Sequence, residues 1–180
     1  MNRRALLAGG AWLAGGSALA SPALARAGVD EDLAEVRLVC ATKRLTISWY
    51  TDWKDSRLAS ADDARWLLGM RRQEEAGYAA LAPLLGTTAP VDDDFEFVYP
   101  AGALKSTNNA HTFAVRLERL ALGVELGAAS RISDPLVAGP IAAIASANAA
   151  HIALLTGALA ALPVALTADD ASARLGEYLQ

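Results

Sequence analysis

Apolar residues recur at helical spacing in four stretches of the chain, and no segment keeps the alternation that is typical of a strand. The first stretch covers about residues 30–56, and its stripe holds Leu33, Val36, Cys40, Lys43, Ile47 and Tyr50. The basic residue on this otherwise apolar stripe is the exception. The pattern predicts an all-α domain.

The second predicted helix begins after Ser60, a suitable N-cap, and ends at Leu85, where Gly86 stops it. Its core stripe is predicted to hold Ala64, Leu67, Leu68, Arg71, Glu75, Tyr78 and Ala82. Because Arg71 and Glu75 lie at i,i+4, an ordinary ion pair on the helix surface also explains them without any site.

A third helix is predicted from Thr107 or Asn108 to Arg131. The fourth follows the Ser133-Asp134-Pro135 turn and runs from Leu136 to about Ala161. Short loops within each pair of helices predict two antiparallel hairpins. The tail beyond Pro163 is expected to hold a short helix at about residues 168–179.

Residues 87–106 lose the helical periodicity and predict a long crossover connection between the two hairpins. Phe95, Phe97 and Tyr99 alternate with other residues there, so we expect a short extended piece that packs its aromatic rings on the bundle. The Asp92–Asp94 run lacks the spaced oxygen ligands of a calcium loop and is interpreted as a solvated turn.

Residues 1–27 have the order of a secretory signal: Asn2-Arg3-Arg4, an apolar stretch over residues 5–20, then Ala25-Arg26-Ala27. The apolar stretch is shorter than the roughly 20 residues that span a bilayer, so cleavage is favoured over a membrane anchor. The paired arginines resemble a twin-arginine signal, a route that carries folded proteins. We expect a periplasmic or secreted protein without membrane attachment after cleavage.

Charge and cysteine content narrow the function further. Removing residues 1–27 takes away three arginines and no acid, so the formal net charge changes from −4 to −7. An acidic chain without a Lys/Arg cluster argues against nucleic acid as a partner. The single cysteine, Cys40, cannot form an intramolecular disulfide and is expected to pack as a small apolar residue.

The last two predicted helices carry a family resemblance. The segment Arg116–Ala129, the Asp134-Pro135 turn and Asn148-Ala149-Ala150-His151 resemble the bacterial ferritin-like domain family that includes desiccation-related proteins. The residues Glu74–Tyr78 and Asp94–Phe97 fit the same family, and the resemblance covers about residues 30–159. It implies a ferritin-like four-helix bundle over residues 28–162, followed by the tail 163–180.

The resemblance also implies a site. Metal-binding bundles of this kind direct six ligands inward, one Glu from each of two helices and a Glu-x-x-His pair from each of the other two. The corresponding positions in this chain are Lys43, Glu75, Tyr78, Glu118, Asn148 and His151. Only Glu75, Glu118 and His151 keep a ligand type, so the resemblance implies a degenerate di-metal set.

The three replacements change the charge of the set. Lys43, Glu75 and Glu118 sum to −1, and two divalent ions among them would leave about +3 in a medium of low dielectric. An ammonium group can lie between two carboxylates and donate three hydrogen bonds. We therefore expect Lys43 to take the place of metal; a Lys43 that reaches solvent is the alternative.

Three functions remain open. The first is an exported, non-catalytic protein with a binding or structural role, no cofactor and a polar network in place of the di-metal centre. The second is an iron or manganese oxidoreductase that uses Glu75, Glu118 and His151. The third is a subunit that is exported with a metal-bearing protein partner, which exposed Trp49, Trp53 or Trp66 would favour. A homo-oligomer fits each of them.

Overall fold

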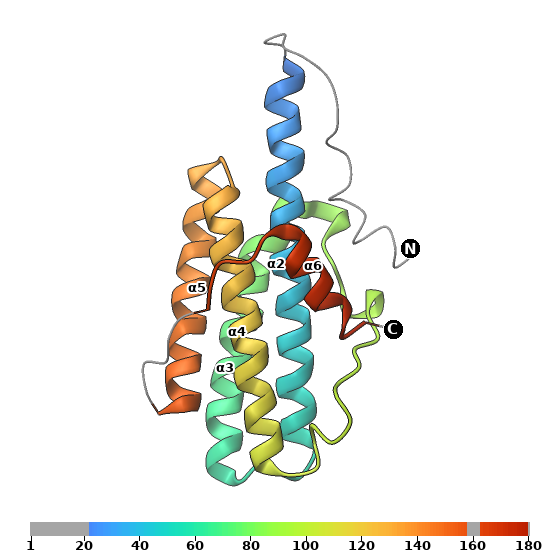
Figure 1. The fold of residues 1–180 in the computed structure, drawn as a ribbon, viewed down its shortest axis with the longest axis vertical. Coiled ribbons are helices and arrows are strands. Elements are labelled where there is room, and N and C mark those ends of the chain that lie inside the picture. Colours follow the sequence, from blue (N-terminus) through green and yellow to red (C-terminus); the bar gives the residue numbers. More distant parts are fainter. Residues whose placement is uncertain (1–21, 158–162, 180) are drawn as a thin grey trace.

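A computed structural model describes residues 22–157 and 163–179, with side chains from Val29 onward. Four long helices form an antiparallel bundle (Figure 1): α2 (Pro22–Asp55), α3 (Ala61–Leu85), α4 (Thr107–Arg131) and α5 (Pro135–Thr156). A short helix, α6 (Ala168–Gly176), packs on α4 and α2. Within the described ranges there is no strand, only an isolated bridge between Phe97 and Leu179. The all-α prediction is confirmed.

Local signals set the helix ends. Ser60 and Asp63 form a capping box at the start of α3, and Gly86 ends this helix with a φ of 55°. Ser106 caps α4, one residue before the predicted cap. Gly157 takes the left-handed conformation after α5, so this helix ends earlier than about residue 161, the predicted end. Residues 158–162 lie outside the described chain.

The connection between α3 and α4 crosses from one hairpin to the other, as the sequence predicts (Figure 1). It holds two 3-10 turns, η2 (Gly86–Thr88) and η3 (Asp92–Asp94), and no further helix. Its three aromatic residues, Phe95, Phe97 and Tyr99, pack partly buried against the core. This confirms the extended piece expected from the alternation.

An aromatic cluster fills the end of the core that the α2–α3 turn closes. Trp49 and Trp53 are fully buried, and Trp49 lies edge-on against Tyr99 and Phe113 at centroid distances of 5.0 and 4.6 Å. Trp66 is half-buried beside Trp53. These tryptophans belong to the packing of the bundle. Cys40 is also buried, and burial raises the pKa of its thiol to about 12.

The C-terminal segment lies directly on α4. The backbone N–H of Leu166 donates to the carbonyl of Gly123, and Arg131 Nη1 donates to the carbonyl of Leu166 at 2.7 Å. A Cβ at Gly127 would lie 2.0 Å from that carbonyl oxygen. Glycine is therefore required at position 127 for the segment to approach the helix.

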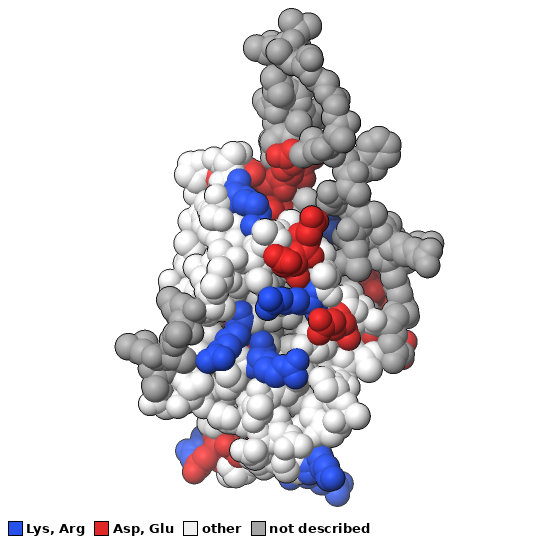
Figure 2. Space-filling view, in the orientation of Figure 1, with Lys and Arg blue, Asp and Glu red and all other residues white. Residues whose placement is uncertain are grey.

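Helix α5 is the most apolar of the four. It is long and apolar enough to cross a membrane by length and composition, yet its apolar window is only 28% buried. Leu136 and Leu154 are exposed, and the edge of the molecule that α5 forms shows almost no charged side chain in Figure 2. Its inward face carries Asn148 and His151 into the core.

The predicted boundary at Ala27 falls inside α2, which begins at Pro22 and extends beyond the other helices (Figure 1). Residues 1–21 lie outside the described chain. The signal peptide and the domain boundaries therefore stay predictions.

Candidate functional site

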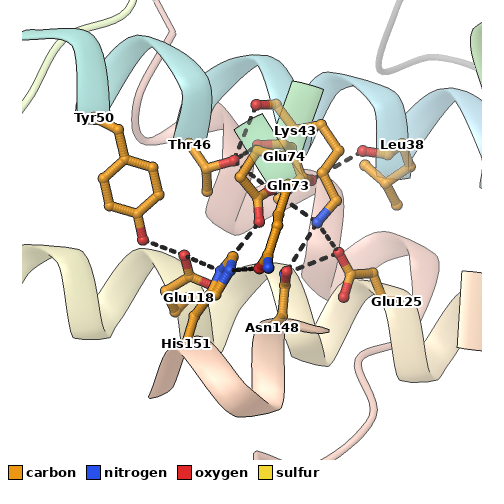
Figure 3. Close-up of polar contacts among 11 residues, drawn as sticks. Leu38, Lys43, Thr46, Tyr50, Gln73, Glu74, Glu118, Glu125, Asn148 and His151 are labelled. Carbon is orange, nitrogen blue, oxygen red and sulfur yellow. Dashed lines mark hydrogen bonds and ion pairs between the residues drawn. The ribbon is translucent and has the colours of Figure 1, made fainter. Parts of the chain in front are cut away.

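A group of buried polar side chains converges at the centre of the bundle (Figure 3). Every long helix contributes to this group, which we call the central network: Lys43, Thr46 and Tyr50 from α2, Glu74 from α3, Glu118 and Glu125 from α4, and Asn148 and His151 from α5. On α2, α4 and α5 the members are three, four or seven residues apart, which places them on one face of their helix.

The ammonium of Lys43 forms one half of the central network. Its Nζ lies 2.8 Å from Glu74 Oε2 and 2.5 Å from Glu125 Oε1, and it donates to Asn148 Oδ1 at 3.1 Å. Asn148 in turn donates to Glu125 Oε1 at 3.0 Å. Each of the three ammonium protons therefore has an acceptor, and the Lys43 side chain is buried rather than solvent-facing.

The imidazole of His151 forms the other half. Its Nδ1 lies 3.2 Å from Glu118 Oε1 and 3.4 Å from Glu74 Oε1. The phenol of Tyr50 donates a short hydrogen bond to the same oxygen of Glu118. On its outer side, His151 Nε2 faces the amide oxygen of Gln73.

Glu74 joins the two halves. Its Oε1 faces His151, whereas its Oε2 accepts from Lys43 and, at 2.9 Å, from the hydroxyl of Thr46. The Thr46 hydroxyl also reaches the backbone carbonyl of Lys43 on its own helix, which fixes its position.

Burial and neighbouring charges shift the pKa values of the network in opposite directions. Burial alone would raise the pKa of Glu74, but the charge of Lys43 and the contact with His151 lower it to about 2. Burial and the charge of Glu74 raise the pKa of Glu118, and burial raises that of Glu125 to about 8 against the opposing effect of Lys43. Glu74 is therefore ionised, whereas burial favours the protonated forms of Glu118 and Glu125.

The two bases of the network hold their protons. Burial opposes the charge on His151, but its contacts with Glu118 and Glu74 raise its pKa to about 9. For Lys43, the charges of Glu74 and Glu125 outweigh burial and raise the pKa above its ordinary value. Both cations of the network therefore face Glu74, whose pKa is lowered.

Two buried carboxylate oxygens lack a hydrogen-bond partner among the described residues. They are Glu118 Oε2 and Glu125 Oε2. A buried acceptor without a partner is uncommon and costs free energy, so each marks a position where a proton, water or cation belongs. The Glu118 atom belongs to the half of the network that holds His151.

The structure brings together four of the six residues that the sequence predicted: Lys43, Glu118, Asn148 and His151. It does not bring Glu75 or Tyr78 into the network. The Glu75 carboxylate is 44% exposed and pairs with Arg71 at 3.4 Å. Tyr78 donates to the carbonyl of Pro90 and lies under the guanidinium of Arg44. These two placements correct the sequence prediction.

The error is a shift of one residue along α3. One position changes the direction of a side chain by about 100°, which takes Glu75 out of the core and puts Glu74 in. A stricter stripe was available in the sequence, because Leu67, Met70, Leu81 and Leu85 share the buried face with Glu74. In this register Gly77, not Tyr78, stands where Glu-x-x-His has its histidine.

Sequence reasoning also missed Glu125, which is not among the six predicted positions. Glu125 lies seven residues after Glu118, two turns along the same face of α4. That spacing was the signal that could have identified it. Tyr50 and Cys40 shared the predicted stripe with Lys43, but nothing in the sequence indicated that the phenol would reach Glu118.

A pair of metal ions does not fit the central network. The ammonium of Lys43 already lies between Glu74 and Glu125. Gly77 offers no imidazole, and the side chain of Ile144 lies 3.5 Å from where its Cβ would be. One side of the network is thus filled by protein atoms.

A single ion does fit the other half. One ligand atom each from Glu74, Glu118 and His151 lies within 4.8 Å of the others, and all three residues are buried. Two carboxylates and one imidazole suit divalent iron or manganese. Glu118 Oε2 provides a lone pair that no other group uses within the described ranges.

The four antiparallel helices direct carboxylates and a histidine into one core. This arrangement is typical of helical bundles that build ion sites from side chains on facing helices. A family model described as a ferritin-like domain matches residues 27–161, and the chain belongs to this family. The matched range ends before the C-terminal segment that packs on α4. No curated protein and no solved structure matches the chain.

Proposed function

We propose that this ferritin-like protein binds one divalent iron or manganese ion through Glu74, Glu118 and His151, with Lys43 fixed in place of a second ion. The convergence of these three buried ligand groups beside a carboxylate oxygen without a partner carries the proposal. A bound ion of either metal would supply one-electron redox chemistry. The role we assign is metal binding, without a catalytic residue.

Charge balance supports one ion rather than two. One divalent ion and the ammonium of Lys43 carry three positive charges, which Glu74, Glu118 and Glu125 offset when all three are ionised and His151 is neutral. A second divalent ion would leave two uncompensated charges in a buried site, where each costs several kcal/mol or more. In the metal-free protein, the raised pKa values of His151 and Glu125 let protons take the place of this charge.

Two adjacent glutamates test the proposal with a matched control. Glu74→Gln should lower the bound iron or manganese of purified protein by more than tenfold, because it removes one of three protein ligands. Glu75→Gln makes the same chemical change one residue away, on the surface, and should leave metal content unchanged. Elemental analysis measures both variants. Equal metal content in them, or none in the parent, would overturn the proposal.

A structural role without metal is the second candidate, and the saturation of Lys43 by three acceptors favours it. In this case the central network fixes the register of the four helices. Absence of bound metal from protein purified out of its native compartment, together with strong destabilisation when Lys43 is replaced, would select this candidate.

Export is part of the proposal and is supported by the sequence alone. A twin-arginine signal peptide is supported by Arg3-Arg4, the apolar stretch and Ala25-Arg26-Ala27. The motifs on α4 and α5 support the desiccation-related group of bacterial proteins. Mass spectrometry of exported protein should find Gly28 at the N-terminus. Replacing Arg3 and Arg4 with Lys should block export, and undiminished export would contradict the twin-arginine route.

The buried Trp49 and Trp53 do not support a co-exported partner.

A further inference from the structure

Gln73 is the polar contact between the central network and the surface of the bundle. Its side chain is exposed on α3, one residue before the network's Glu74, and its amide oxygen faces Nε2 of His151 (Figure 3). Gln73 is not one of the proposed metal ligands, and no sequence pattern singled it out. Its position next to the only imidazole of the network gives it a role.

The surroundings of the ring assign the two nitrogens of His151. Nδ1 points inward to Glu118 and Glu74, at 3.2 and 3.4 Å, where both neighbours are acceptors. Nε2 points outward to the amide oxygen of Gln73, which is an acceptor as well. A nitrogen that keeps an acceptor in every state keeps its proton, whereas Nδ1 can exchange its proton for a cation held by the same carboxylates.

We propose that Gln73 is a positioning residue, which keeps the proton on Nε2 of His151 and thereby makes Nδ1 the atom that binds a metal ion. This inference rests on the proposed metal-binding function. Histidine ligands ordinarily donate their second N–H to a fixed acceptor, which sets the tautomer and the orientation of the ring. Here an amide on the neighbouring helix supplies that acceptor.

The direction of the Gln73 amide decides which nitrogen of His151 keeps its proton. If Gln73 instead turned its NH2 group to His151, Nε2 would be the acceptor, and Nδ1 would keep a proton that faces the carboxylates. A ring held in this way would have no free nitrogen for an inward metal ion. A side chain at position 73 that can only accept a hydrogen bond should therefore preserve metal binding in the first orientation. In the second orientation it should change which nitrogen of His151 carries the proton.

Three substitutions separate these cases. Gln73→Leu keeps the approximate size of the side chain and removes the hydrogen bond, and Gln73→Ala repeats the loss with a smaller residue. Gln73→Glu replaces the amide with a carboxylate, which in its ionised form accepts hydrogen bonds and cannot donate them. Glu75→Gln is the matched control, since it alters a neighbouring side chain of α3 that pairs with Arg71 outside the network.

The first measurement uses metal-free protein. The chain has two histidines, so in a His111→Gln background every imidazole signal belongs to His151. The parent should show a slowly exchanging Nε2–H proton in a ¹H–¹⁵N spectrum. Gln73→Leu and Gln73→Ala should lose that signal to exchange with water, whereas Gln73→Glu and Glu75→Gln should keep it.

The second measurement is the affinity for zinc(II), a diamagnetic probe of the site. Gln73→Leu should weaken binding by about 10–100-fold, the usual effect of removing the partner of a metal-bound histidine. Gln73→Glu should bind at least as tightly as the parent. If Gln73→Leu keeps both the Nε2–H signal and an affinity within about threefold of the parent, Gln73 has no positioning role. Failure of Gln73→Glu to keep the signal would also overturn it.

The two measurements separate this inference from the function on which it rests. A parent that binds no zinc contradicts the proposed function, and the Nε2–H signal of metal-free protein then still decides whether Gln73 fixes the ring. A parent that binds zinc with all three Gln73 variants unaltered contradicts the inference alone.

Discussion

The two halves of the central network share Glu74 and the same depth of burial, yet their hydrogen bonding differs. Around Lys43, all three ammonium protons meet an acceptor, at 2.5, 2.8 and 3.1 Å. Around His151, one oxygen of Glu118 has no partner among the described side chains. Glu125 Oε2, in the first half, also lacks a partner, so the two halves differ in their cation. The first half already holds the ammonium of Lys43, and we call it saturated because every ammonium proton has an acceptor. The second half holds a cation only when His151 is protonated or a metal ion binds.

This difference assigns separate roles to the two halves. A saturated buried ion pair contributes little net stability over an apolar core, but removal of one partner is costly because it leaves a buried charge alone. An unsaturated cluster of carboxylate and imidazole groups is typical of a binding site. We therefore expect the Lys43 half to hold the bundle in one register, and the His151 half to exchange a proton for a metal ion.

The largest expected effect is the loss of the cation from the saturated half. Lys43→Met leaves Glu74 and Glu125 close together without an ammonium, and it should lower the free energy of unfolding by about 3–5 kcal/mol. Urea unfolding at neutral pH measures the change. The triple variant Lys43→Met, Glu74→Gln and Glu125→Gln should recover much of the loss, because it removes the two carboxylates together with the cation.

A lysine of the same helix provides the control for this experiment. Lys54 has a side chain that is 34% exposed and pairs with Asp55 at the surface. Lys54→Met should change the free energy of unfolding by no more than about 0.5 kcal/mol. A Lys43→Met variant as stable as the Lys54→Met variant would remove the structural role of the saturated half.

The next effect is the dependence of stability on pH in the unsaturated half. Folding raises the pKa of His151 from 6.5 to about 9, so its contribution is complete below pH 6.5 and is lost as the pH rises through about 9. The loss amounts to about 3 kcal/mol. Folding also raises the pKa of Glu125 from 4.5 to about 8, so this group lowers the free energy of unfolding as the pH rises between these two values.

Urea unfolding of metal-free protein at several pH values measures this dependence. The free energy of unfolding should fall between neutral and alkaline pH, and His151→Gln should flatten the part of the curve near pH 9. His111→Gln removes the other histidine, which packs against Trp53, and should leave the curve unchanged. A flat parent curve would place the His151 charge outside the network.

The smallest expected effect comes from converting the saturated half into a second metal site. Lys43→Glu, Gly77→His and Asn148→Glu together complete the ligand set in the corrected register, and Ile144→Ala makes room for the new imidazole. This variant should bind about two equivalents of manganese(II), and the second site should add about 2.7 kcal/mol of stability when the free ion is at 100 times its Kd.

A variant with Tyr78→His in place of Gly77→His is the control for this register. Position 78 faces Arg44 and the carbonyl of Pro90, so its imidazole lies outside the bundle core. It should bind no second ion. Thermal melting with and without manganese(II) compares the two variants, and equal shifts would mean that the positions do not converge as described.

The sequence was sufficient to predict the four helices because periodicity, caps and stop signals agree. Ser60, Gly86 and Asp134 each mark a boundary that the backbone uses. It was also sufficient for one or two site residues of α2, α4 and α5, where a polar residue interrupts an otherwise apolar stripe, although it missed Glu125. Lys43 and Glu118 are examples, and both are fully buried.

The register of α3 was predicted wrongly, because its stripe of large apolar residues is interrupted around the two glutamates. Glu74 and Glu75 are neighbours among alanines, and alanine packs at the core or at the surface with little difference in free energy. Tyr78 joined the predicted stripe because an aromatic ring is apolar, although its hydroxyl reaches the crossover connection instead. The choice between two adjacent glutamates depended on contacts with Lys43 and His151, which are distant in the sequence.

The close approach of Leu166 to Gly127 also makes the C-terminal segment sensitive to a single methyl group. That segment follows the range matched by the ferritin-like family, and its docking uses a space that exists only where a side chain is missing from α4. Any other residue at position 127 would occupy this space, so it would displace the carbonyl of Leu166 and, with it, the segment that leads into α6.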